Sequence, residues 1–124
     1  MADGGQTLRH RTRRFALDVI ALVARLPRNI ATDAVARQLV RSGTGVAANH
    51  RAAGRARSRR EFAARLAVAL EEADESEFWL QTLLDGKLAA QELVEPCYKE
   101  SRELRAILAA SVRTARKSLN SLAP

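Results

Sequence analysis

The amino-acid sequence predicts an all-α protein, an antiparallel up-down-up-down four-helix bundle. Alanine, leucine, arginine and glutamate dominate the composition and aromatic residues make up only 4%, a balance typical of long helices. Apolar residues recur at alternating spacings of three and four in four segments, which is the period of one helix face. Short connections separate the segments, and such connections favour antiparallel neighbours. With 124 residues available, we expect a single domain over residues 7–120.

The first helix is predicted over about residues 8–27, after a polar, glycine-rich tail of residues 1–6 that we expect to be disordered. Pro27 ends this helix. Its apolar seam consists of Leu8, Phe15, Val19, Leu22 and Leu26. Arginines crowd its first turns, where the helix macrodipole disfavours cations by about 0.3 kcal/mol or more per charge. Either the helix begins later, or an anion lies nearby.

The second helix is predicted over residues 32–54, with Thr32 as its N-cap. It contains Gly43 and Gly45, each of which costs about 1 kcal/mol relative to alanine inside a helix. Such glycines are tolerated where another backbone must come close, so we expect a tight helix–helix crossing, within the chain or between chains. A phosphate-binding glycine loop is the weaker interpretation, because the Gly-Lys-Ser/Thr sequence and a preceding strand are both missing.

The third helix is predicted over residues 58–84 and opens with a capping box between Ser58 and Glu61. Its apolar seam is expected at Phe62, Leu66, Ala69, Ala73, Leu80 and Leu83. A fourth helix is predicted over residues 93–119. The pattern leaves open whether residues 87–96, which include Pro96, are helix or loop.

Opposite charges on the second and third helices predict structural pairing between them. If the two helices pack antiparallel around a corner near residue 56, Arg41 lies level with Glu71 and Glu72. Arg37 then lies level with Glu75. We therefore interpret this acidic cluster first as the partner of arginines on the second helix.

Positive charge is concentrated in the first half of the chain. Residues 1–62 hold 13 lysines and arginines against four acids, whereas residues 63–124 hold eight against ten. Arginine makes bidentate contacts to phosphate and releases condensed counterions, so this asymmetry indicates nucleic-acid binding. A solvated helix face is the competing interpretation, because 18 arginines accompany only three lysines. The candidate nucleic-acid-binding residues are Arg9, Arg11, Arg13, Arg14, Arg51, Arg55, Arg57, Arg59 and Arg60.

The sequence offers no pattern for catalysis, for a metal or for a cofactor. Its two histidines, His10 and His50, lack the Glu-x-x-His pairing of di-iron bundles and the partners of a catalytic triad. The acids lie along a helix among arginines rather than in an apolar cleft. We interpret Cys97 as a small helix residue, and Trp79 as an anchor of the core or of a subunit interface. We expect neither an enzyme nor a small-molecule substrate.

A cytoplasmic location is expected, without a membrane partner. No run of 18 apolar residues is present for a membrane span, and residues 1–6 lack the apolar core of a signal peptide. The single cysteine agrees with a reducing compartment.

Residues 37–51, RQLVRSGTGVAANHR, resemble the signature of the bacterial four helix bundle protein family, also called 23S rRNA intervening-sequence proteins. The resemblance continues in AVALEEADESEFWL (67–80), ELRAIL (103–108) and VRTAR (112–116), and covers about residues 12–118. Two positions depart from the family pattern: Ala52 replaces a usual glutamate and His50 a usual aromatic residue. If that glutamate pairs with a basic neighbour in other members of the family, Arg51 or Arg55 is left freer here.

The resemblance implies a fold and an assembly more than an activity. Members form up-down bundles that associate as ring-shaped homopentamers, and many are encoded inside insertions in 23S rRNA genes. A related basic pentamer, the accessory variability determinant of diversity-generating retroelements, works with a reverse transcriptase and nucleic acid. Two hypotheses therefore stay open for this chain. One is a non-catalytic module that binds RNA or DNA backbone. The other is a scaffolding protein that binds a protein partner and uses its arginines in salt bridges within and between subunits.

Overall fold

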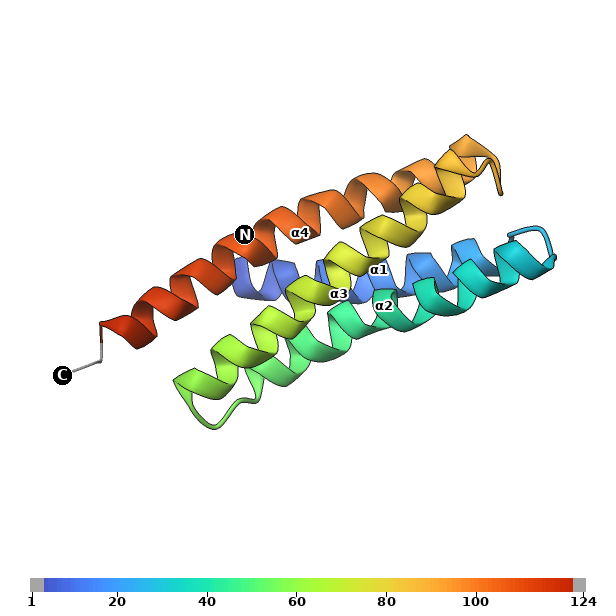
Figure 1. Cartoon of the computed structure of the whole chain (residues 1–124). Coiled ribbons are helices and arrows are strands. Elements are labelled where there is room, and N and C mark those ends of the chain that lie inside the picture. Colours follow the sequence, from blue (N-terminus) through green and yellow to red (C-terminus); the bar gives the residue numbers. More distant parts are fainter. Residues whose placement is uncertain (1–3, 122–124) are drawn as a thin grey trace.

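The computed structural model describes residues 4–121, and this part of the chain contains four helices and no strand. The helices are α1 (Gly4–Ala24), α2 (Ile30–Gly54), α3 (Arg59–Asp85) and α4 (Gln91–Asn120). Figure 1 shows them as long rods, with α2 beside α3, α4 along α3, and α1 along α2. The contact between α1 and α4 is the smallest of the four helix contacts. The prediction of an all-α fold with four helices is thus confirmed over the described residues.

The first helix begins and ends earlier than its seam predicts. Residues 1–3 of the expected tail lie outside the described residues, whereas residues 4–6 belong to α1. Leu8, the first buried residue of the seam, lies one turn inside α1, because the helix already begins at Gly4. At the other end, Pro27 disfavours the helical conformation in the residue before it, and α1 stops at Ala24.

The two helices of the central hairpin have well-defined N-caps. Asn29, not Thr32, caps α2, because its extended backbone lets its side-chain oxygen accept a hydrogen bond from the Thr32 amide at 2.9 Å. Thr32 itself is buried inside the first turn. Ser58 caps α3 as predicted, and its hydroxyl oxygen accepts from the Glu61 amide at 3.0 Å.

The connection from α3 to α4 is a tight turn centred on Lys87. Lys87 adopts φ 52°, the left-handed region that favours glycine, while Gly86 beside it has φ −81°. The amide of Leu88 donates to the Leu83 carbonyl at 3.0 Å, which closes the end of α3 in a Schellman motif. Residues 87–90 are therefore a connection, and α4 runs on from Gln91 with Pro96 inside it.

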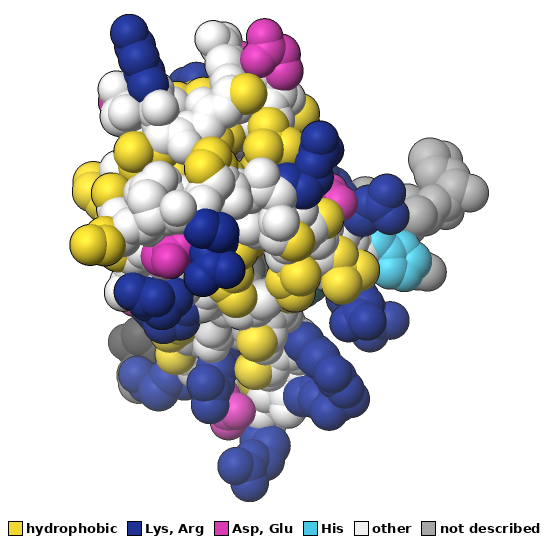
Figure 2. Space-filling view, turned by 90° about the vertical axis from the view of Figure 1, so that its right-hand side faces the viewer, with side chains coloured by type: hydrophobic (Ala, Val, Ile, Leu, Met, Phe, Trp, Pro, Cys, Tyr) yellow, Lys and Arg dark blue, Asp and Glu magenta, His cyan; other side chains and the backbone are white. Residues whose placement is uncertain are grey.

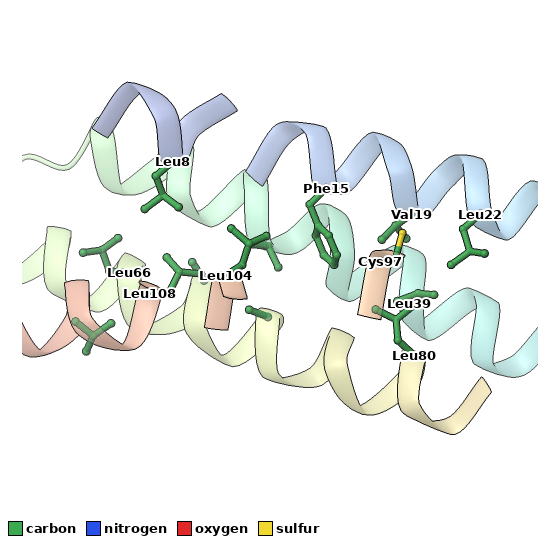
Figure 3. Close-up of a cluster of buried hydrophobic side chains, with 14 of the residues drawn as sticks. Leu8, Phe15, Val19, Leu22, Leu39, Leu66, Leu80, Cys97, Leu104 and Leu108 are labelled. Atoms are coloured by element: carbon green, nitrogen blue, oxygen red, sulfur yellow. The ribbon is translucent and has the colours of Figure 1, made fainter. Parts of the chain in front are cut away.

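The core is one continuous apolar cluster along the bundle, with contributions from all four helices (Figure 3). Val19, Leu39, Leu80 and Leu104 have no exposed surface. Cys97 is buried in the same cluster, and burial raises the pKa of its thiol to about 11. None of the helices in the described part is long and apolar enough to cross a membrane.

The two glycines of α2 lie where neighbouring helices come close, as predicted. A Cβ atom on Gly43 would lie 3.0 Å from both methyl groups of Val19 in α1. A Cβ atom on Gly45 would lie 2.5 Å from the Glu72 carboxylate in α3. The glycines therefore admit α1 on one side of α2 and an acidic side chain of α3 on the other.

Candidate nucleic-acid interface

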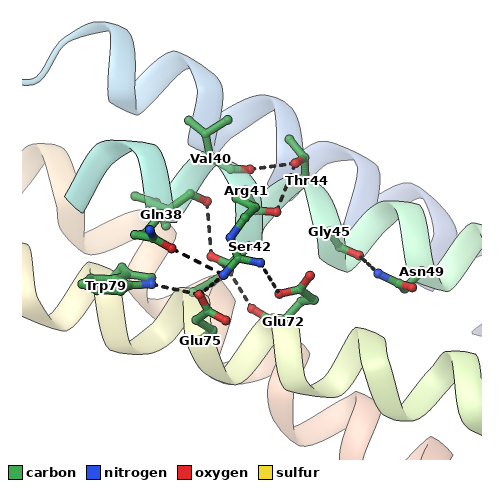
Figure 4. Close-up of polar contacts among 12 residues, drawn as sticks. Gln38, Val40, Arg41, Ser42, Thr44, Gly45, Asn49, Glu72, Glu75 and Trp79 are labelled. Carbon is green, nitrogen blue, oxygen red and sulfur yellow. Dashed lines mark hydrogen bonds and ion pairs between the residues drawn. The ribbon is translucent and has the colours of Figure 1, made fainter. Parts of the chain in front are cut away.

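An ion-pair cluster joins the middle of α2 to α3 (Figure 4). Arg41 forms ion pairs with Glu75 and, at 3.8 Å, with Glu72. Burial raises the pKa of the Glu72 carboxyl more than the nearby Arg41 lowers it. Within residues 8–121, neither Arg37 nor Glu71 forms an ion pair, so Arg41 alone makes the predicted link between the two helices.

Trp79 extends this cluster along α3. It is half-buried against the core, and its indole nitrogen donates a hydrogen bond to the Glu75 carboxylate at 3.2 Å. The exposed ring of Phe78 meets it edge-on, with ring centroids 4.8 Å apart. Trp79 is therefore packed within its own chain, and its role at a subunit interface stays a prediction.

Two of the nine candidate arginines are engaged by acids of their own chain. Arg11 of α1 binds Glu100 at 2.6 Å and Glu103 at 3.0 Å, both in α4. The hydrogen bond with Glu100 raises the pKa of Arg11 above its usual value. Arg14 lies 3.5 Å from Asp18 on the exposed side of α1. Arg11 thus joins α1 to α4, where the helix contact is smallest.

The other seven candidates are exposed and form no ion pair within residues 8–121. They are Arg9, Arg13, Arg51, Arg55, Arg57, Arg59 and Arg60. We call this set the free arginines. They come from the first half of α1, the last turn of α2, the connection between α2 and α3, and the first turn of α3. On the face in Figure 2, basic side chains are far more widespread than acidic ones, and apolar side chains are exposed between them.

A shallow hollow of about 340 Å³ lies against the connection between α2 and α3. Arg51, Arg55 and Arg57 line it together with Arg65, a residue outside the predicted set. Among the described residues, Glu61 is the one acid in its lining. Arg65 follows Glu61 by four positions and therefore lies on the same face of α3. This spacing is visible in the sequence and could have added Arg65 to the predicted set.

A larger groove of about 1760 Å³ is lined by residues of all four helices. It lies among most of α1, the last half of α2, the first turns of α3 and the last half of α4. Among the side chains of residues 8–121, its lining contains no acid. Five free arginines line it: Arg9, Arg13, Arg51, Arg55 and Arg59. Phe62, expected in the buried seam, is 40% exposed and lines this groove, whereas the next residue, Ala63, is buried.

His50 lies half-buried in the lining of the same groove. Its Nδ1 atom is buried and has no hydrogen-bond partner in the described part of the chain. Burial lowers the pKa of His50, and the positive charge of Arg9 lowers it further. The imidazole is therefore neutral near pH 7.

Comparison with known proteins agrees with the fold. Residues 7–110 match the family described as 23S rRNA-intervening sequence protein. The chain is also similar to a protein with unknown function from the S23 ribosomal protein family of Bacteroides thetaiotaomicron VPI-5482, known from a crystal structure. That similarity has 29% sequence identity and a TM-score of 0.80, and it covers 88% of this chain and 97% of the other. No curated protein matches the chain.

Proposed function

Because the chain belongs to the 23S rRNA-intervening sequence protein family, we propose that it is a non-catalytic, oligomeric protein that binds nucleic acid through the free arginines. The observation that carries this proposal is the set of seven exposed arginines, unpaired within residues 8–121, that come from two separate segments. Elsewhere in the bundle, arginines such as Arg41 and Arg105 are bound by acids of a neighbouring helix. Among residues 8–121, the free arginines have no such acid to compete with a phosphate group.

Arginine suits this role because its guanidinium binds phosphate oxygens in a bidentate manner. Contacts to the backbone release condensed counterions, and they supply affinity without sequence preference. We therefore propose recognition of the RNA or DNA backbone, in the cytoplasm, without a cofactor or metal.

Assembly would strengthen such binding. We propose that the four helices run up-down-up-down and that the chains associate as a ring-shaped homo-oligomer, the pentamer that the family resemblance implies. A ring repeats the free arginines once per subunit and gains avidity for a polyanion. The mass of the purified protein in solution tests this part of the proposal.

The main experiment measures binding to a structured RNA and to double-stranded DNA across a salt series. The variant replaces Arg55, Arg57, Arg59 and Arg60 by alanine. Each lost phosphate contact makes the slope of log K against log salt shallower by about 0.9 on duplex DNA. We expect micromolar or tighter binding near physiological salt for the wild type, and a loss of at least about tenfold for the variant.

The matched control removes the same charge from exposed positions that line neither the hollow nor the groove: Arg25, Arg37, Lys99 and Arg102. Equal losses in both variants would mean that net charge alone attracts the polyanion. An intact wild-type oligomer that binds neither duplex nor single-stranded nucleic acid at low salt would refute the proposal.

A scaffolding role is the second candidate. The observation that favours it is the use of Arg11, Arg41 and Arg105 in ion pairs between helices of one chain. Arginines at the connection between α2 and α3 could bind acids of another subunit or of a protein partner in the same way. In that case the fourfold arginine variant loses its oligomeric state rather than its affinity for nucleic acid.

A further inference from the structure

The groove among the four helices combines positive charge with large exposed apolar side chains. The hollow at the α2–α3 connection does not have this combination. Within the described side chains, the lining of the groove holds five free arginines and no acid. It also contains large apolar side chains that are open to solvent, with Leu17 49% exposed, Ile20 47% and Phe62 40%. These side chains reach the groove from α1 and α3.

The positive charges of the groove favour a polyanion as its ligand. Arg9 and Arg13 stand on α1, whereas Arg51, Arg55 and Arg59 stand on the end of α2 and the start of α3. Positive charge therefore enters the groove from two sides. An apolar ligand would leave these guanidinium groups without partners.

The exposed apolar side chains distinguish a single strand from a duplex. A duplex presents phosphates and sugars outward and keeps its base faces stacked inside, so Leu17, Ile20 and Phe62 would face a charged backbone. Single strands have base faces free to stack on aromatic side chains. A cationic groove that holds aromatic side chains is the usual arrangement for single-stranded binding, and Phe62 supplies an exposed aromatic ring in this groove.

We infer that this groove binds single-stranded nucleic acid, with phosphates on the arginines and bases against Phe62, Leu17 and Ile20. This inference rests on the proposed function and adds the class of nucleic acid to it. From Leu8 to Ile20 the groove follows α1 for about 18 Å. That length holds about five nucleotides at the stacked spacing of 3.4 Å.

Fluorescence anisotropy with labelled oligouridylate, oligodeoxythymidylate and an RNA duplex of the same length tests the inference. We expect both single strands to bind at least about tenfold more tightly than the duplex. The two single strands separate RNA from DNA as the natural source. Phe62→Ala should weaken single-strand binding about tenfold and leave duplex binding unchanged.

The matched control is Phe78→Ala, which removes another exposed phenylalanine of α3, one that does not line the groove. It should leave binding unchanged, and a melting curve and the mass in solution should show that both variants stay folded and assembled. Phe62→Tyr keeps a ring for stacking and should restore most of the affinity.

The inference is overturned if the duplex binds as tightly as the single strands, or if Phe62→Ala and Phe78→Ala have equal effects. It is also overturned if Leu17→Asp lowers the mass of the oligomer but leaves single-strand binding intact, because another copy of the chain then covers the groove. Tight duplex binding would leave the proposed function standing, whereas no binding of any of the three probes refutes both.

Discussion

The hydroxyl oxygens of Ser42 in α2 and Ser76 in α3 lie 2.9 Å apart, and both residues are fully buried. They form a polar link in the middle of the helix pair whose adjoining ends and connection carry most of the free arginines. Each hydroxyl also has a backbone neighbour, the Leu39 carbonyl at 3.3 Å from Ser42 and the Glu72 carbonyl at 2.8 Å from Ser76. Neither hydroxyl is left without a partner if the other is removed.

We expect Ser42→Ala and Ser76→Ala each to lower the free energy of unfolding by about 1 kcal/mol, the net value of one hydrogen bond. The double variant should lose little more than either single variant, because the shared hydrogen bond can be lost only once. Urea denaturation of the wild type, the two single variants and the double variant measures these losses of unfolding free energy. Strictly additive losses would show that the two hydroxyls do not act together.

The glycines of α2 should respond to alanine in opposite directions. Alanine gains about 1 kcal/mol of helix propensity at either position. At Gly43 the new methyl group would press on Val19, whose branched side chain is stiff, and overpacking of about 1–3 kcal/mol should make Gly43→Ala destabilising. At Gly45 it would meet the end of the flexible Glu72 side chain, so Gly45→Ala should be neutral or slightly stabilising. Thermal and urea unfolding would show whether the signs differ.

The turn after α3 should be improved by moving its glycine. Lys87→Gly removes a side chain from the left-handed region and should stabilise the protein by about 1 kcal/mol. Gly86→Ala should destabilise it, because the new Cβ atom would lie 3.0 Å from the Thr82 carbonyl oxygen. The melting temperatures of the two variants test this pair of predictions, and a lower value for Lys87→Gly would contradict it.

Stability should fall as the pH drops from about 7.5 to 5.5, through protonation of His50. Its pKa is lowered in the folded state, so the unfolded chain binds the proton first and the stability present above the ordinary pKa is lost below it. One proton limits the slope to about 1.4 kcal/mol per pH unit. His50→Gln should remove the dependence. His10→Gln, at an exposed position, should retain it, and the same slope in all three proteins would rule His50 out.

Local signals in the sequence predicted much of the fold. Ser58 and Pro27 mark helix ends through short-range geometry, and the periodic seams place four helices. Thr32 failed as an N-cap because Asn29, three residues earlier, is an equally good capping residue and its backbone is extended there. Which of the two residues caps α2 depends on the backbone conformation of the chain after Pro27.

The contacts between helices were harder to predict. Arg41 was expected opposite Glu71 and Glu72, yet it binds Glu75 as well as Glu72. Side chains lean toward the N-terminus of their own helix, so on antiparallel helices Arg41 reaches away from the corner and Glu75 reaches toward it. Counting residues from the corner ignores this lean.

The candidate site shows the same limit. The sequence identified the basic segments but not which arginines are free, because Glu100 and Glu103, which engage Arg11, lie on another helix about 90 positions away. The exposure of Phe62 likewise depends on how the four helices fit together at the groove, which its own apolar spacing does not record. Which arginines form ion pairs and which apolar side chains are exposed depend on how the helices pack, whereas the positions of the arginines along the chain can be read from the sequence.

The buried thiol of Cys97 can report how often the bundle opens. At pH 8 a thiol with a pKa of about 11 is ionised in only about one molecule in a thousand, and the surrounding core shuts out reagents as well. Alkylation of Cys97 in the native protein therefore requires the helices to separate far enough to admit a reagent. The alkylation rate, measured with and without a bound strand, would show how nucleic acid changes the opening of the bundle, and no added label is needed.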